Sequence, residues 1–100
     1  MRIDIQFVSM PTSGSMELYT RSKLERLFHK YDSIIRTTVH FKRELNEKVN
    51  GRICEMEVSL NGPRIHATAN ERNFELAVKN AISDLDRQLE KRKGILKPYA

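Results

Sequence analysis

The chain has 100 residues, of which 39% are hydrophobic and 31% are charged, with a formal net charge of +5. This length supports one small hydrophobic core, so we expect a single compact domain over residues 1–100, and the regular apolar spacing disfavours intrinsic disorder. A lone cysteine excludes an internal disulfide, and no apolar run approaches the roughly 20 residues of a membrane-spanning helix.

The first half of the chain predicts a strand, a helix and a second strand. Residues 2–8 alternate as in a half-buried strand and lack the apolar segment of a secretory signal, so we expect a cytoplasmic protein. Ser13 or Ser15 can cap a helix whose apolar stripe runs from Met16 to Tyr31. A second alternation places four side chains toward the core, namely Ile35, Thr37, Val39 and Phe41.

The second half predicts a hairpin, two strands and a long helix. Residues 44–52 read as the hairpin connection. The next two strands place these residues toward the core: Cys54, Met56, Val58, Leu60, Ile65, Ala67 and Ala69. The last helix has Asn70 or Asn73 as its cap and Gly94 as its end, with a flexible tail at 94–100. Its continuous apolar face consists of Phe74, Ala77, Val78, Ala81, Ile82, Leu85 and Leu89.

The element order βαβββα predicts an α+β fold. Four strands with one apolar face each need one cover, and two helices with one apolar stripe each can supply it. We therefore expect a four-stranded mixed sheet with both helices packed on one face. The other face should be solvated, and it carries Arg2, Arg36, Lys42, Glu55, Glu57, Arg64 and His66.

No spacing in the sequence assembles an enzyme's site. Cys54 falls on the core-facing side of its strand, where a cysteine acts as a small apolar side chain. His29, His40 and His66 are scattered without the spacing of metal ligands, and the glycines form no phosphate-binding loop. We therefore expect no catalysis, no metal and no other cofactor.

Basic residues concentrate on the two predicted helices. At about 100° per residue, Lys23, Arg26 and Lys30 share one flank of the first helix with Tyr19. Both flanks of the last helix carry basic residues, which are Arg72, Lys79, Arg87, Lys91, Arg92 and Lys93. The helix macrodipole favours Lys and Arg at a C-terminus, but between residues 87 and 97 five basic groups face one acid. This surplus favours binding to a polyanion.

Structured RNA fits this charge pattern better than unpaired bases do. The predicted solvated sheet face lacks the aromatic residues on which bases stack, whereas helical Lys and Arg suit phosphates and 2′-hydroxyls. Three acidic residues weaken the positive field at the end of the last helix: Asp84, Asp86 and Glu90.

Three segments carry a resemblance to a known family, namely KLERLF at 23–28, NGPRIHATA at 61–69 and LDRQLEKRK at 85–93. In order and spacing they resemble the ribosome hibernation promoting factor family, also called ribosome-associated inhibitor A or sigma-54 modulation proteins, from Ile3 to about Lys97. The resemblance implies a fold similar to double-stranded RNA-binding domains. It also implies a translation inhibitor that preserves ribosomes in stress or stationary phase by occupying the mRNA and tRNA path of the small subunit.

The resemblance further implies which residues contact rRNA. Basic positions of the family's pattern coincide with Lys23, Arg26, Arg87, Lys91 and Lys93. Gln88 matches its Arg-Gln-Leu element, Asp84 stands where the family usually has Lys, and Lys79 would add a basic contact. Together with the charge pattern, the predicted RNA-binding residues are Lys23, Arg26, Lys30, Lys79, Arg87, Gln88, Lys91, Arg92 and Lys93.

The expected partners are the small ribosomal subunit and its rRNA and, with another factor, ribosome dimers. No membrane partner is expected, and the free protein should be a monomer. We expect the short, single-domain form of the family, without the linker and dimerisation domain of its long form. Two alternatives stay open, which are a protein-binding transcription regulator of the sigma-54 modulation type and a generic structured-RNA-binding domain.

Overall fold

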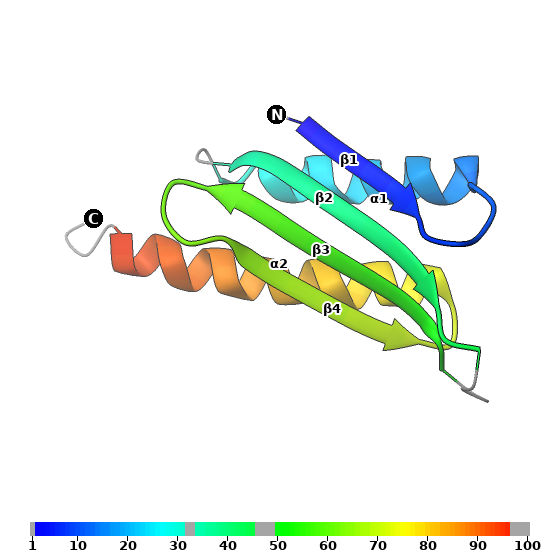
Figure 1. Ribbon diagram of the computed structural model, residues 1–100. Helices are drawn as coiled ribbons and strands as arrows, with labels where there is room; N and C mark the ends of the chain where they lie inside the picture. The colour runs from blue at the N-terminus through cyan, green and yellow to red at the C-terminus, as the bar shows by residue number, and fades with distance from the viewer. Residues whose placement is uncertain (1, 32–33, 46–49, 97–100) are drawn as a thin grey trace.

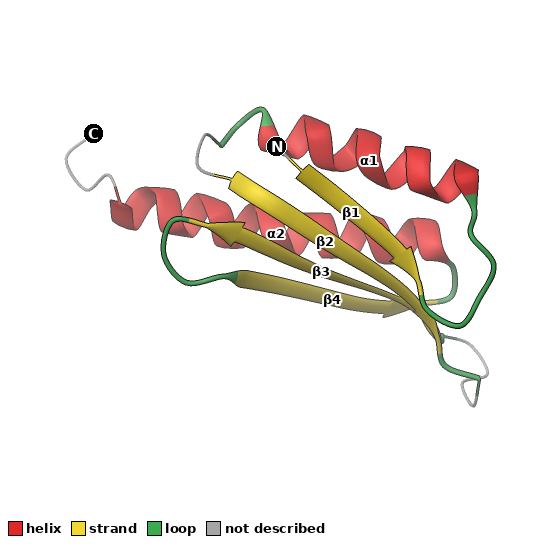
Figure 2. Ribbon diagram, turned by 45° about the horizontal axis from the view of Figure 1, so that its top comes forward, coloured by secondary structure: helices red, strands yellow, loops and turns green. Residues whose placement is uncertain are grey.

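The computed structural model describes residues 2–31, 34–45 and 50–96, with side-chain burial described for residues up to 92. Its elements are β1 (Arg2–Phe7), α1 (Gly14–Phe28), β2 (Ile34–Arg43), β3 (Arg52–Leu60), β4 (Ile65–Glu71) and α2 (Phe74–Leu96). The strands form one sheet in the order β1-β2-β3-β4, in which β1 and β2 are parallel and the other pairs are antiparallel. The two helices lie on the same face of this mixed sheet (Figures 1 and 2), which confirms the predicted fold.

The core lies between the sheet and the helices. Strand alternation supplies its lower layer, with Ile3, Thr37, Val39, Phe41, Cys54, Met56, Val58, Leu60, Ile65, Ala67 and Ala69 buried. The upper layer comes from α1 through Leu24, Leu27 and Phe28, and from α2 through Ala77, Val78, Ala81, Leu85 and Leu89. Full burial of one Leu side chain contributes about 1.5–3 kcal/mol, so Leu85→Ala would loosen the attachment of α2.

Both helices begin at residues that the sequence offered as caps. The Oγ of Ser13 accepts a hydrogen bond of 3.2 Å from the Met16 N–H at the start of α1. The Oδ1 of Asn73 accepts one of 2.8 Å from the Leu76 N–H at the start of α2. The other candidate for α2, Asn70, instead accepts a hydrogen bond from the Gly51 N–H at 2.6 Å. Each cap satisfies a backbone donor that has no partner within its helix.

The predicted end of the first helix was wrong by one turn. α1 ends at Phe28, whereas the apolar stripe predicted a helix as far as Tyr31. The N–H groups of Lys30 and Tyr31 bond to carbonyls three residues earlier, Leu27 and Phe28, each at 3.2 Å. This tighter turn still leaves the ring of Tyr31 buried, so its apolar spacing did not distinguish it from a helical residue.

Ile35 does not face the core, contrary to the alternation in the sequence. The pairing of β2 with β3 shifts register between Ile34 and Arg36, and the side chain of Ile35 is 58% exposed. Ile34 packs against the core instead. A bulge adds one residue to a strand and so reverses the face on which the preceding residues point.

Gly94 does not end the last helix. α2 continues through Gly94 to Leu96, so residues 94–96 of the predicted flexible tail are helical, and residues 97–100 lie outside the described part. A glycine ends a helix where it takes a left-handed conformation; inside a helix it only costs about 1 kcal/mol relative to Ala.

The face of the sheet opposite the helices is polar and solvated, as predicted. Cross-strand ion pairs cover part of it, including Lys42 with Glu55 at 2.9 Å and Arg64 with Glu57 at 3.0 Å. Such exposed pairs contribute about 0–1 kcal/mol each and leave this face hydrophilic. Within the described residues, no helix combines the length and apolarity that spanning a bilayer requires.

Candidate nucleic-acid interface

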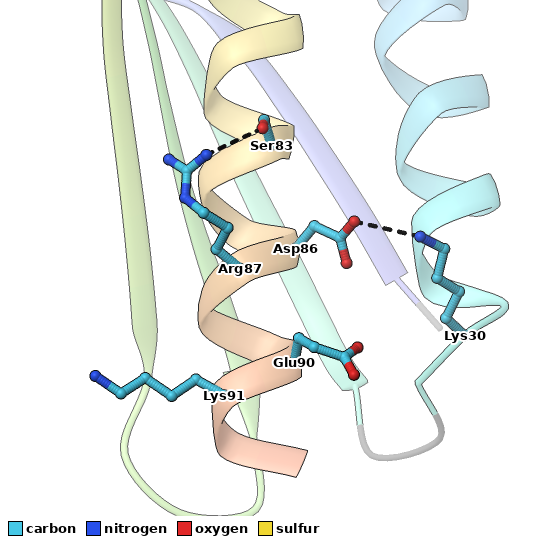
Figure 3. Close-up of a pocket in the computed structure, with 6 residues that line it drawn as sticks. All are labelled: Lys30, Ser83, Asp86, Arg87, Glu90 and Lys91. Carbon is cyan, nitrogen blue, oxygen red and sulfur yellow. Dashed lines mark hydrogen bonds and ion pairs between the residues drawn. The ribbon is translucent and has the colours of Figure 1, made fainter. Parts of the chain in front are cut away.

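An open hollow of about 530 Å³ lies where the C-terminal half of α2 faces the end of α1. Its walls are Lys30, Ser83, Asp86, Arg87, Glu90 and Lys91, drawn in Figure 3. In this view Asp86 and Glu90 extend toward α1, whereas Arg87 and Lys91 extend away from it. Three predicted RNA-binding residues, Lys30, Arg87 and Lys91, therefore line one hollow, and two carboxylates extend from α2 toward α1.

Tyr31 joins the two helices at this hollow. The residue is 8% exposed, and its hydroxyl oxygen lies 2.6 Å from Oδ1 of Asp86 and 2.9 Å from Oε2 of Glu90. Asp86 also pairs with the ammonium group of Lys30 at 3.2 Å. We name these four residues, Lys30, Tyr31, Asp86 and Glu90, the interhelix seam. The helical stripe predicted Tyr31 as an apolar, core-facing residue, and the polar role of its hydroxyl was not predicted.

The seam changes the acidity of two of its members. Burial, and then the neighbouring carboxylates of Asp86 and Glu90, raise the pKa of the Tyr31 phenol well above its usual range. The Tyr31 hydroxyl holds the pKa of Asp86 below its ordinary value, and Lys30 acts in the same direction against partial burial, which raises it. Asp86 therefore stays ionised and Tyr31 stays neutral over the physiological range.

The predicted basic flank of α1 is presented to solvent. The Nζ of Lys23 lies 5.4 Å from the centroid of the Tyr19 ring, a cation–π distance. Arg26 is exposed, and the side chain of Lys30 is 58% exposed although it pairs with Asp86. These three cations can approach an anion without any change in the fold.

The basic residues of α2 are held in different ways. The guanidinium of Arg87 contacts Oγ of Ser83 at 3.2 Å and Oδ1 of Asp84 at 3.5 Å, yet its side chain is 71% exposed. Lys79 and Lys91 are exposed as well. The backbone of Lys93 belongs to α2, but its side chain lies outside the described part.

Gln88 and Arg92 contact the edge of the sheet. The Nε2 of Gln88 donates to the carbonyl of His66 on β4 at 2.7 Å and to Oδ2 of Asp84 at 3.2 Å. The Nη1 of Arg92 donates to the carbonyl of Pro63 at 2.6 Å. These bonds satisfy carbonyls at the β4 edge and fix α2 against it.

Asp84, which departs from the family's basic pattern, orients two predicted RNA-binding residues. One carboxylate oxygen accepts from Gln88 and the other faces Arg87. Both contacts stay on α2, three or four residues from Asp84, where side chains of one helix meet. Where the resemblance implies a Lys, this chain therefore has an acid that holds the side chains of Gln88 and Arg87 in position.

The described residues offer little that resembles a catalytic centre. Cys54 is fully buried, and burial, followed by the charge of Glu55, raises the pKa of its thiol to about 12. A thiol in this state is a poor nucleophile. No three His, Cys, Asp or Glu side chains of the described part gather in an arrangement that could hold a metal ion.

Comparison with known proteins gives a family and a fold. The family model described as sigma 54 modulation protein / S30EA ribosomal protein matches residues 3–97, which confirms the family that the sequence resembles. The chain is similar to a ribosomal subunit interface protein from Coxiella burnetii, with a TM-score of 0.84 and 24% identity over 94% of this chain and 99% of that one. It is also similar to the Thermus thermophilus Protein Y N-terminal domain, with a TM-score of 0.78 and 18% identity over 91% and 98% of the two chains. No curated protein matches the sequence significantly.

Proposed function

This chain belongs to the sigma 54 modulation protein / S30EA ribosomal protein family, and we propose that it acts on the ribosome as a non-enzymatic translation inhibitor. It binds small-subunit rRNA in the decoding channel, where mRNA and tRNA would otherwise lie, and preserves idle ribosomes during stress or stationary phase. The name of the Coxiella burnetii relative, a ribosomal subunit interface protein, supports a ribosomal site of action.

The observation that carries this proposal is the exposure of basic side chains on two helices that lie on one face of the sheet (Figure 2). The proposed contact residues are Lys23, Arg26, Lys30, Lys79, Arg87, Gln88, Lys91, Arg92 and Lys93. Each Lys or Arg that reaches a phosphate releases condensed counterions, so several of them together give strong, salt-dependent binding. Gln88 and Arg92 also hold α2 in place through β4.

The fold favours backbone and shape recognition over base stacking. The rings of Phe7 and Phe41 stack on each other, with their centroids 5.0 Å apart, and both side chains pack in the core. The described part of the open sheet face carries no Phe, Tyr or Trp on which a base could stack. Helical cations suit the phosphates and 2′-hydroxyls of structured RNA.

Co-sedimentation with purified small ribosomal subunits tests the proposal. The wild-type protein should sediment with the subunits, and the bound fraction should fall steeply as salt rises. A Lys23→Glu, Arg87→Glu, Lys91→Glu triple variant should lose binding. An Arg2→Glu, Lys42→Glu, Arg64→Glu variant makes the same change in net charge on the open sheet face and should retain it. If the helix variant has an unchanged circular dichroism spectrum and still binds fully, the proposed surface is wrong.

A second candidate follows from the first half of the family's description, sigma 54 modulation protein. Under this alternative the chain binds another protein and regulates transcription. RNase treatment separates the two functions, because a contact with protein alone survives it and an rRNA contact does not.

Ribosome binding and ribosome dimer formation can be tested together. We propose that the free protein is a monomer and that dimers of ribosomes form only with another factor. A sucrose gradient of ribosomes with and without the purified protein should show the protein in the ribosome fractions and no dimer peak. A dimer peak with the protein alone would contradict the need for another factor.

A further inference from the structure

The interhelix seam places two carboxylates beside the cations proposed to bind RNA. Asp86 is compensated there, because Lys30 pairs with one of its oxygens at 3.2 Å and the Tyr31 hydroxyl contacts the other at 2.6 Å. Glu90 reaches the same hydroxyl at 2.9 Å and is exposed. The two acids therefore have different surroundings although they are one helical turn apart.

One hydroxyl cannot serve both carboxylates at once. A tyrosine hydroxyl carries a single hydrogen, so Tyr31 donates to Asp86 or to Glu90 at any moment. The shorter distance favours Asp86, which Lys30 also keeps in position. Glu90 consequently retains a negative charge that the seam neutralises less than that of Asp86.

The position of Glu90 gives this charge an effect on RNA. Glu90 lines the same hollow as Lys30, Arg87 and Lys91. A phosphate that contacts Lys30 lies near the Glu90 carboxylate as well, because the Tyr31 hydroxyl joins that carboxylate to Asp86, the ion-pair partner of Lys30. Negative charges closer together than the screening length, about 8 Å at physiological salt, repel each other.

We propose that Glu90 is an affinity-limiting residue of the RNA-binding surface, held at the seam by Tyr31, and that its carboxylate keeps binding weaker than the surrounding cations alone would make it. This inference rests on the proposed function and concerns the regulation of the same surface. Asp86 has the separate role of joining α2 to α1 through Tyr31 and Lys30.

Glu90→Gln tests the proposal with little structural change. The amide that this substitution introduces has the shape of the carboxylate and can donate to the Tyr31 oxygen while Tyr31 donates to Asp86. The matched control is Glu55→Gln, which makes the same change in net charge on the open sheet face, where no proposed RNA-binding residue lies.

The measurement is the Kd for purified small ribosomal subunits at 0.15 M salt, with urea unfolding to confirm that each variant is folded. Glu90→Gln should tighten binding roughly threefold to tenfold, and Glu55→Gln should change it by less than about twofold. Glu90→Asp, which keeps the charge, should stay within about twofold of the wild type. At 1 M salt, where the screening length falls to about 3 Å, any gain should shrink.

Two failures are distinguishable. If the wild-type protein binds subunits but Glu90→Gln and Glu55→Gln have equal effects, or Glu90→Gln weakens binding, this inference is overturned and the proposed function stands. If the wild-type protein does not bind subunits even at low salt, the proposed function itself is overturned.

Discussion

Tyr31 and Asp86 are 55 positions apart in the sequence, and the hydroxyl of Tyr31 donates a 2.6 Å hydrogen bond to the carboxylate of Asp86. This bond connects the turn that follows α1 with the C-terminal half of α2. Because Lys30 and Arg87 lie next to these two residues, the bond also sets the separation of the basic groups on the two helices.

Removal of the Tyr31 hydroxyl should destabilise the protein. Tyr31→Phe keeps the buried ring but leaves Asp86 and Glu90 without their shared donor. The free energy of unfolding should fall by about 1–3 kcal/mol, the usual cost of losing a partner of a charged group. Urea titration measures the change. Tyr19→Phe removes a hydroxyl from a half-exposed ring and should cost less than about 0.5 kcal/mol; equal costs would contradict a role for the seam.

The seam should also contribute to acid stability. The pKa of Asp86 is lowered in the folded protein, mainly by the Tyr31 hydroxyl and further by Lys30. A lowered folded-state pKa stabilises the protein above the unfolded value of about 3.9, and this contribution is lost as the pH falls through the folded pKa. Unfolding free energies between pH 2 and 6 should therefore fall less steeply on acidification for Asp86→Asn than for the wild type. Parallel curves would show that Asp86 is not coupled to folding.

Cys54 should weaken the fold at alkaline pH. Burial raises the pKa of its thiol to about 12 in the folded protein, against about 8.5 in an unfolded chain. A raised folded-state pKa gives stability that is complete below pH 8.5 or so and is lost as the pH rises toward the folded value. The difference in unfolding free energy between the wild type and Cys54→Ala should therefore shift by up to about 1.4 kcal/mol per pH unit between pH 9 and 10. A constant difference would contradict the assigned shift.

Two buried threonines should respond in opposite ways to valine. Thr20 and Thr37 are both fully buried, but the hydroxyl of Thr20 donates to the Met16 carbonyl at 2.8 Å. The Oγ1 of Thr37 has no hydrogen-bond partner among the described residues. Thr37→Val should raise the free energy of unfolding by about 1 kcal/mol, because it removes an unsatisfied polar group from the core. Thermal unfolding checks the sign of this change in stability. Thr20→Val loses the hydrogen bond from Thr20 to the Met16 carbonyl and should not be stabilised.

Local patterns predicted most of the fold. The predicted core-facing residues of α2 keep the helical period and those of β3 and β4 alternate throughout. The structure buries all of them except Phe74 and Ile82 of α2, which are partly buried against the core. Two of the wrong predictions concern residues whose placement depends on strand pairing or turn geometry and not on the spacing of apolar residues. Ile35 is exposed because of the way β2 pairs with β3, and Tyr31 follows the helical spacing although a tight turn places it. Neither pairing nor turn geometry is encoded in the spacing of apolar residues.

The candidate site was predicted as a set of charges and not as a set of contacts. Lys30, Arg87 and Lys91 could be found from their spacing on two helices. The bond from Gln88 to the carbonyl of His66, 22 residues away, could not, because it depends on how α2 lies along the edge of β4. A polar tyrosine at the end of an apolar stripe, with acids on the facing helix, was the available signal for the seam.

The separation of Tyr31 from its partners has a consequence for the order of folding. Strands β2, β3 and β4 follow one another as antiparallel neighbours, so they can pair through contacts that are close in sequence. The seam instead joins residues 55 and 59 positions apart, and closing such a long loop is entropically unfavourable before the rest of the chain is in place. A chain that has formed only its hairpins therefore lacks the two-helix surface, so the proposed RNA-binding surface should form late in folding.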